Sequence, residues 1–130
     1  MANGKKSKDQ MSGDERSNFM EGLMATQRGL EESIDLLIQR KGVTNDAKEM
    51  TEISIAQSRL RSELSMRDSE LTAFLADKLV VRAPTQAEVE QIKKVTDDIY
   101  RMQAASATAT AIISAGTQLA TQWKSIAMPA

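Results

Sequence analysis

Apolar residues spaced three and four positions apart predict a first helix over residues 13–41. Ser12, followed three residues later by Glu15, has the spacing of a capping box, which marks a helix start. Gly42 stands where a glycine commonly ends a helix. The apolar stripe of this predicted helix consists of Met20, Leu23, Leu30, Ile34 and Leu37.

A second helix is predicted over residues 46–81, which contain neither glycine nor proline. Asp46 is suited to cap its first turn, and Pro84 prevents the helix from continuing. Arg67 falls on the apolar stripe within the polar run 65–69, so this run is the candidate place for a bend or a break. The stripe itself consists of Met50, Ile53, Leu60, Leu64, Leu71 and Phe74.

A third helix is predicted over residues 86–126. It begins at a second capping box, Thr85 with Glu88, directly after a proline. The apolar spacing then enters residues 104–123, which carry no charge and are mostly Ala, Ser, Thr and Gly. Because the helical spacing continues on both sides of this stretch, we predict one uninterrupted helix.

Together these patterns predict an all-α fold. Two short connections imply an up-down-up three-helix bundle, elongated and coiled-coil-like, with a long hairpin between the second and third helices. Residues 13–127 are expected to form a single helical domain, with a flexible polar tail over residues 1–12 and a short tail over residues 128–130.

The unequal lengths of the predicted helices suggest a first candidate interaction surface. The first helix is too short to cover the whole hairpin, so the end near Pro84 is expected to be an uncovered two-helix tip. Exposed apolar side chains there require a cover: a second copy of the chain, another protein, or a bend that folds the tip back. The residues predicted to bind a partner at this tip are Leu71, Phe74, Leu75, Leu79 and Ile92.

The small-residue stretch is the second candidate surface, and its partner-binding residues are predicted to be Ala107, Ala111, Ala115 and Trp123. The three alanines repeat every four residues and let a neighbouring backbone come close. A second smooth face is formed by Ala105, Ala109, Gly116 and Ala120. Two alternatives remain open: an alanine-rich helix whose Ser and Thr side faces water, and a labile helix that orders only on assembly.

Composition argues against catalysis. The chain has no Cys and no His, which removes thiol nucleophiles, imidazole bases and zinc sites with nitrogen or sulfur ligands. The six glycines are scattered, so no phosphate-binding loop is predicted. Paired acids such as Asp97 and Asp98 fit a solvated helix face. We therefore expect no enzyme activity, no cofactor, no metal and no small-molecule substrate.

Charge and hydropathy limit the partners and the cellular location that we expect. The net charge is −1 and the basic groups have acids close by, so no nucleic-acid partner is expected. Residues 104–123 are too rich in Ser and Thr for a membrane span. Residues 1–18 lack the apolar segment of a cleavable signal peptide, which favours a cytoplasmic location. Lys5, Lys6 and Lys8 leave open a basic arm or a non-classical export signal.

These observations favour a non-catalytic structural or interaction protein. We expect it to self-associate, or to dock a protein partner, through apolar helical surfaces. The alternative is a small helical adaptor or export chaperone that holds a partner helix, for which the eight methionines would provide adaptable contacts. No motif in the sequence selects a known family.

Overall fold

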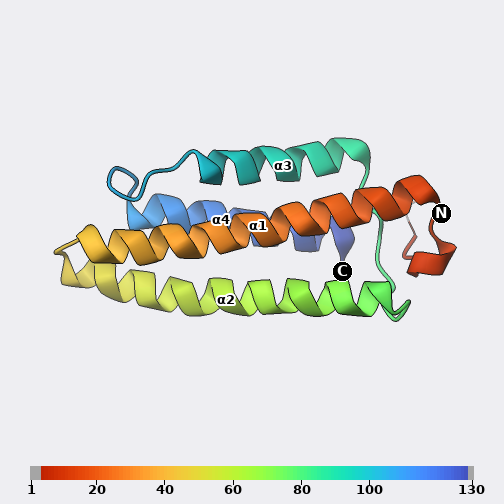
Figure 1. Ribbon diagram of the computed structural model, residues 1–130, viewed down its shortest axis with the longest axis horizontal. Helices are drawn as coiled ribbons and strands as arrows, with labels where there is room; N and C mark the ends of the chain where they lie inside the picture. Colours follow the sequence, from red (N-terminus) through yellow and green to blue (C-terminus); the bar gives the residue numbers. More distant parts are fainter. Residues whose placement is uncertain (1–3, 129–130) are drawn as a thin grey trace.

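The computed structural model describes residues 4–128, and its regular secondary structure within this range is helical, with one isolated β-bridge (Figure 1). The predicted all-α class is confirmed, but the predicted three-helix count is wrong because the described chain forms four α-helices. A one-turn 3-10 helix, η1, precedes them. The bounds are η1 Lys8–Gln10, α1 Gly13–Val43, α2 Ala47–Leu75, α3 Gln86–Tyr100 and α4 Ala109–Ala127.

The caps read from the sequence set the starts of α1, α2 and α3. Ser12 and Glu15 form the predicted capping box, each side chain accepting from the other residue's backbone N–H. The Asp46 carboxylate accepts from the backbone N–H of Lys48. At the other end, α1 continues through Gly42 to Val43, two residues beyond the predicted end. Gly42 does not adopt the left-handed conformation that would have stopped the helix there.

Helix α2 is continuous over residues 65–69, but it ends at Leu75 rather than at residue 81. The chain turns at Asp77, whose φ of 58° lies in the left-handed region. The backbone N–H of Lys78 donates to the carbonyl of Ala73 at 2.8 Å, which closes the last turn. The residues that follow form a linker to α3, so the predicted long hairpin between the second and third helices does not exist.

The third predicted helix is divided into α3 and α4 by a loop over residues 101–108. Thr108 caps the new helix, its hydroxyl accepting from the backbone N–H of Ala111. Arg40 of α1 holds the loop: Nη1 lies 3.4 Å and 3.5 Å from the carbonyl oxygens of Ala104 and Ala105. This reversal lets α4 return along α1 instead of extending α3.

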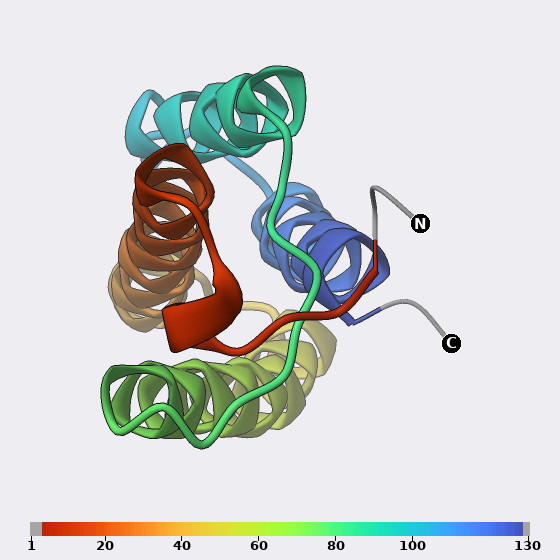
Figure 2. The same ribbon diagram turned by 90° about the vertical axis from the view of Figure 1, so that its right-hand side faces the viewer.

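Helix α1 contacts each of the other three helices and forms the centre of the bundle. The colour gradient in Figure 1 shows that α1 and α3 run in one direction and α2 and α4 in the other. The linker over residues 76–85 crosses one end of the bundle from α2 to α3 (Figure 2). The prediction of an uncovered two-helix tip is therefore wrong. Helix α3 packs along α1, so it forms part of the four-helix bundle instead of projecting from it.

Much of the segment expected to be a flexible tail is held against that linker. Lys6 and Val81 exchange both backbone hydrogen bonds, at 2.7 Å and 2.9 Å, where the N-terminal segment crosses the linker in Figure 2. The backbone N–H of Asp9 donates to the carboxylate of Asp77 at 3.1 Å. Met11 is buried. Residues 1–3 and 129–130, which were also assigned to tails, lie outside the described residues.

The core is built around three aromatic rings from three helices. The Phe19 ring of α1 stacks on Phe74 of α2, with centroids 4.3 Å apart, and lies 5.3 Å from the Trp123 ring of α4. Gly22 makes room for the indole: a Cβ at this position would stand 2.8 Å from Trp123 Cζ3. Gly29, two turns further along α1, makes room in the same way for the side chain of Leu119.

Candidate interaction surface between α2 and α4

The structure does not bring the five predicted tip residues together on a surface. Phe74 and Ile92 are buried in the core, on α2 and α3 respectively. Leu71 and Leu79 are half-buried against it. Leu75 alone among the five is largely exposed. In this fold, a partner at the linker end of the bundle would meet Leu75 rather than the whole predicted set.

The predicted small-residue surface is also dispersed. Ala107 lies in the loop before α4, Ala111 is exposed, Ala115 is half-buried, and Trp123 is fully buried. Three residues of the second smooth face, Ala109, Gly116 and Ala120, are buried in α4, whereas the fourth, Ala105, is exposed in the loop before it.

Gly116 shows why that second face turns inward. A Cβ on this residue would stand 3.1 Å from Ser33 Oγ of α1 and 3.2 Å from the methyl groups of Leu60 of α2. The absence of a side chain therefore brings α4 close to two helices at once. The small residues on the opposite side of α4 remain toward the surface.

A buried polar cluster joins α2 to α4 next to the aromatic core. The guanidinium of Arg67 contacts Glu63 at 3.2 Å and Glu70 at 2.9 Å, although the Arg67 side chain is only 2% exposed. The indole N–H of Trp123 donates to Glu70 at 3.0 Å, and Lys124 pairs with Glu63. Both carboxylates are therefore engaged by cations or donors, which suits a structural link better than acid–base chemistry.

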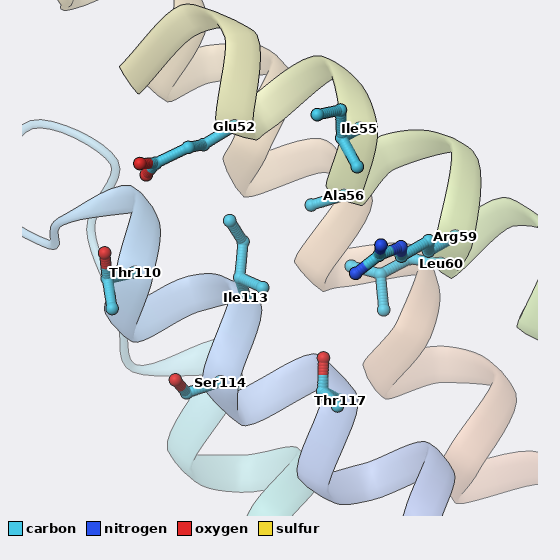
Figure 3. A pocket seen from close by; sticks show the side chains of 9 residues that line it. All are labelled: Glu52, Ile55, Ala56, Arg59, Leu60, Thr110, Ile113, Ser114 and Thr117. Carbon is cyan, nitrogen blue, oxygen red and sulfur yellow. The ribbon is translucent and has the colours of Figure 1, made fainter. Parts of the chain in front are cut away.

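A groove opens between α2 and α4 on one side of this cluster, with a volume of about 390 Å³ (Figure 3). Its apolar part comes from both helices, and Ile55 in particular is 51% exposed. Figure 3 shows Ile113 projecting from α4 toward α2. The groove is lined by Glu52, Ile55, Ala56, Arg59, Leu60, Thr110, Ile113, Ser114 and Thr117.

The charges at the groove differ from those of the buried cluster. Glu52 and Arg59 both extend from α2 at the groove in Figure 3. Among the residues that the structure describes, neither side chain makes an ion pair within 4.0 Å. The hydroxyl groups at the groove, such as Ser114 and Thr117, come from α4. The groove therefore presents an apolar floor with two unmatched charges of opposite sign.

The hollowed face continues along both helices. A second hollow shares Arg59, Leu60 and Thr117 with the groove and extends to Lys124. A third lies beyond it and includes Met66, which is 41% exposed, and Met128. We call this whole surface, from Glu52 to Met66 on α2 and from Thr110 of α4 to Met128 just after it, the α2–α4 face.

Sequence reasoning missed the α2–α4 face because its exposed isoleucine, Ile55, lies off the main apolar stripe of α2. Ile55 stands two positions after the buried Ile53, on a different side of α2. The available signal was the pair Glu52 and Arg59, which are seven residues apart and so share a side of a helix with Ile55 between them.

No described helix combines the length and the apolar character that a bilayer crossing requires. Within residues 4–128, no group of three or more acidic side chains is placed to hold a metal ion. Comparison of the chain with protein-family models, with curated proteins and with solved structures finds no match.

Proposed function

We propose that this protein is a non-catalytic structural protein that self-associates through the α2–α4 face. The observation that carries the proposal is the groove in which Ile55 and Ile113 meet water between two helices. Burying a side chain as large as isoleucine contributes about 1.5–3 kcal/mol, so covering this groove with an apolar helical surface favours association. A second copy of this chain carries such a surface.

The polar groups of the face support binding rather than catalysis. Nucleophilic catalysis requires a hydroxyl within hydrogen-bond reach of a base. Around the groove, the hydroxyls of Ser114 and Thr117 lie on α4, and Glu52 on α2 makes no hydrogen bond to them. In the adjacent cluster, Glu63 and Glu70 are held by Arg67 and its neighbours. We propose that Glu52, Ser114 and Thr117 position a partner, whereas Glu63 and Glu70 link α2 to α4.

A second candidate function is that of an adaptor or export chaperone that holds an amphipathic helix of another protein. Met66 and Met128, at the far end of the α2–α4 face, favour this alternative. Methionine is flexible and polarisable, so a methionine-lined surface adapts to differing side chains. In either role we propose a cytoplasmic protein with a protein partner, and a non-classical export route is retained for the adaptor role.

Light scattering coupled to size-exclusion chromatography tests self-association. The purified chain is measured from about 1 µM to about 500 µM, a range that covers a micromolar dissociation constant. We expect the unaltered chain to form a discrete oligomer. The Ile55→Asp variant is expected to have the mass of a monomer. The matched control is Ile38→Asp on α1, where the isoleucine is 47% exposed, close to the 51% of Ile55.

Two results would decide against the proposal. A monomer throughout the concentration range rejects self-association and leaves the adaptor role. An oligomer that is lost with Ile38→Asp and kept with Ile55→Asp moves the interface to α1. Circular dichroism of each variant establishes that the helices are intact, so that loss of association is not mistaken for unfolding.

A further inference from the structure

Helix α2 carries a pattern on the α2–α4 face that is complementary to itself. Glu52 and Arg59 have opposite charges and are separated by two helical turns, about 10.5 Å along the axis. Ile55 and Ala56 lie midway between them, and all four side chains line the groove. A helix with this arrangement matches its own reversed copy, charge to opposite charge and apolar residue to apolar residue.

We infer that two copies of the chain pack their α2–α4 faces together about a two-fold axis that passes at the level of Ile55 and Ala56. This inference rests on the proposed self-association and specifies its geometry. A two-fold axis perpendicular to α2 reverses the direction of the second copy. It therefore brings Glu52 of each copy to the level of Arg59 of the other, and an interface of this kind contacts itself.

The electrostatics of the single chain favour this arrangement. Two basic groups further along this face are already engaged: Arg67 with Glu63 and Glu70, and Lys124 with Glu63. Glu52 and Arg59 are in no ion pair among the described residues, although both lie at the groove in Figure 3. Pairing across the axis would form two equivalent ion pairs in the dimer, each between Glu52 of one copy and Arg59 of the other, with the apolar residues between the two pairs.

The shape of α4 is compatible with the approach of a second copy. Thr110, Ser114 and Thr117 follow one another along the groove side of α4, and all three are small. Ile113 projects between Glu52 and Arg59 in Figure 3, near the level of the proposed axis. In the dimer it would be covered by the exposed Ile55 of the second α2.

Charge reversal tests the arrangement by sedimentation equilibrium of the purified full chain. Glu52→Arg alone opposes two arginines at each pair, and Arg59→Glu alone opposes two glutamates. We expect each single variant to weaken the dimer by about tenfold or more. The double variant Glu52→Arg with Arg59→Glu reverses both charges, restores the opposite-sign pairs, and is expected to associate within about threefold of the original chain.

The outcomes separate this inference from the proposed function. If Ile55→Asp dissociates the dimer while both single charge variants leave it unchanged, self-association stands and the two-fold geometry is rejected. A double variant no tighter than either single variant also rejects the geometry. If the unaltered chain is a monomer at every concentration, both the proposed self-association and the two-fold geometry are rejected.

A thiol crosslink provides an independent measurement, because the chain has no cysteine of its own. Ile55→Cys places a thiol next to the same residue of the second copy at the axis. A short bis-maleimide is expected to join this variant into covalent dimers at concentrations where the chain associates. The matched control Ile38→Cys is expected to remain monomeric, and efficient crosslinking of the control alone would overturn the arrangement.

Discussion

The indole N–H of Trp123 donates a hydrogen bond to the Glu70 carboxylate at 3.0 Å, and both side chains are buried. The other carboxylate oxygen accepts from Arg67 at 2.9 Å. Through this carboxylate, the last turns of α4 are tied to α2 beside the aromatic core. Toward the start of α4, the same two helices are separated by the groove. The polar cluster therefore ties the two helices together beyond the groove.

Trp123→Phe tests this anchor. The change removes the donor and part of the ring, and we expect it to lower the free energy of unfolding by about 2–3 kcal/mol. Urea denaturation followed by circular dichroism measures the loss. Repeating the substitution in a Glu70→Leu background completes a double-mutant cycle, for which we expect a coupling of about 1 kcal/mol. Additive effects would mean that the hydrogen bond contributes nothing beyond packing.

Arg67→Met tests the buried ion pairs. It leaves Glu70 buried without its cation, so we expect a loss of about 3–5 kcal/mol in the free energy of unfolding. Adding Glu70→Gln removes the stranded charge and should recover part of that loss. The control is Arg61→Met on the exposed side of α2, which should change stability by no more than about 0.5 kcal/mol. An equal loss of unfolding free energy in both arginine variants would contradict a special role for the buried ion pairs.

Gly22→Ala tests the close approach of α4 to α1. Alanine favours a helix over glycine by about 1 kcal/mol, but its Cβ would collide with the rigid, buried ring of Trp123. We expect the collision to prevail, with a net destabilisation of about 1–3 kcal/mol. Gly42→Ala is the matched control, because a Cβ there meets nothing within 4 Å. It should stabilise the protein by about 0.5–1 kcal/mol in thermal unfolding.

The loss of folding stability at acid pH should depend on Glu49. Hydrogen bonds from the Thr44 hydroxyl and from Arg40 hold the pKa of this carboxyl below its ordinary value of 4.5. The charged form is favoured in the folded chain, so its contribution is present above about pH 4.5 and is lost as the pH falls through the lowered pKa. We expect Glu49→Gln to flatten the fall of the urea midpoint in this range. An unchanged slope would show that other carboxyls dominate.

The helix starts could be predicted because their signals are local. Ser12 with Glu15, and Thr85 with Glu88, satisfy backbone donors within one turn, and these bonds form whatever the rest of the fold does. The helix ends were harder to predict. Asp77 adopts a left-handed φ without the usual glycine, so the end of α2 at Leu75 left no clear mark in the sequence.

The break between α3 and α4 was missed for a different reason. Ala, Ser and Thr in residues 101–108 are compatible with a helix, and the apolar spacing resumes in α4. The contact that accompanies the break is long-range, from Arg40 of α1 to the loop carbonyls of Ala104 and Ala105. Thr108 as a cap was the one local clue, but it lies in a run where many residues are Ser or Thr.

These errors in the helix bounds led to the wrong candidate surface. With α3 and α4 taken as one helix, Phe74 and Ile92 were expected at an uncovered tip, whereas the extra reversal places both in the core. The groove exists because α4 returns beside α2, so Ile55 could not be recognised as part of a surface until that return was known. The stripe position of Arg67 suggested a bend or break, whereas α2 is continuous there and Arg67 is buried in ion pairs with Glu63 and Glu70.

The contacts between α1 and α4 restrict how these two helices can slide along each other. Gly22 receives Trp123, Gly29 receives Leu119, and Gly116 lies against Ser33, so bulk on one helix meets a missing side chain on the other. A shift of one turn in either direction would move the indole away from Gly22 and onto a residue with a side chain. The two antiparallel helices therefore have one permitted axial register, and the position of the α2–α4 groove is determined by it.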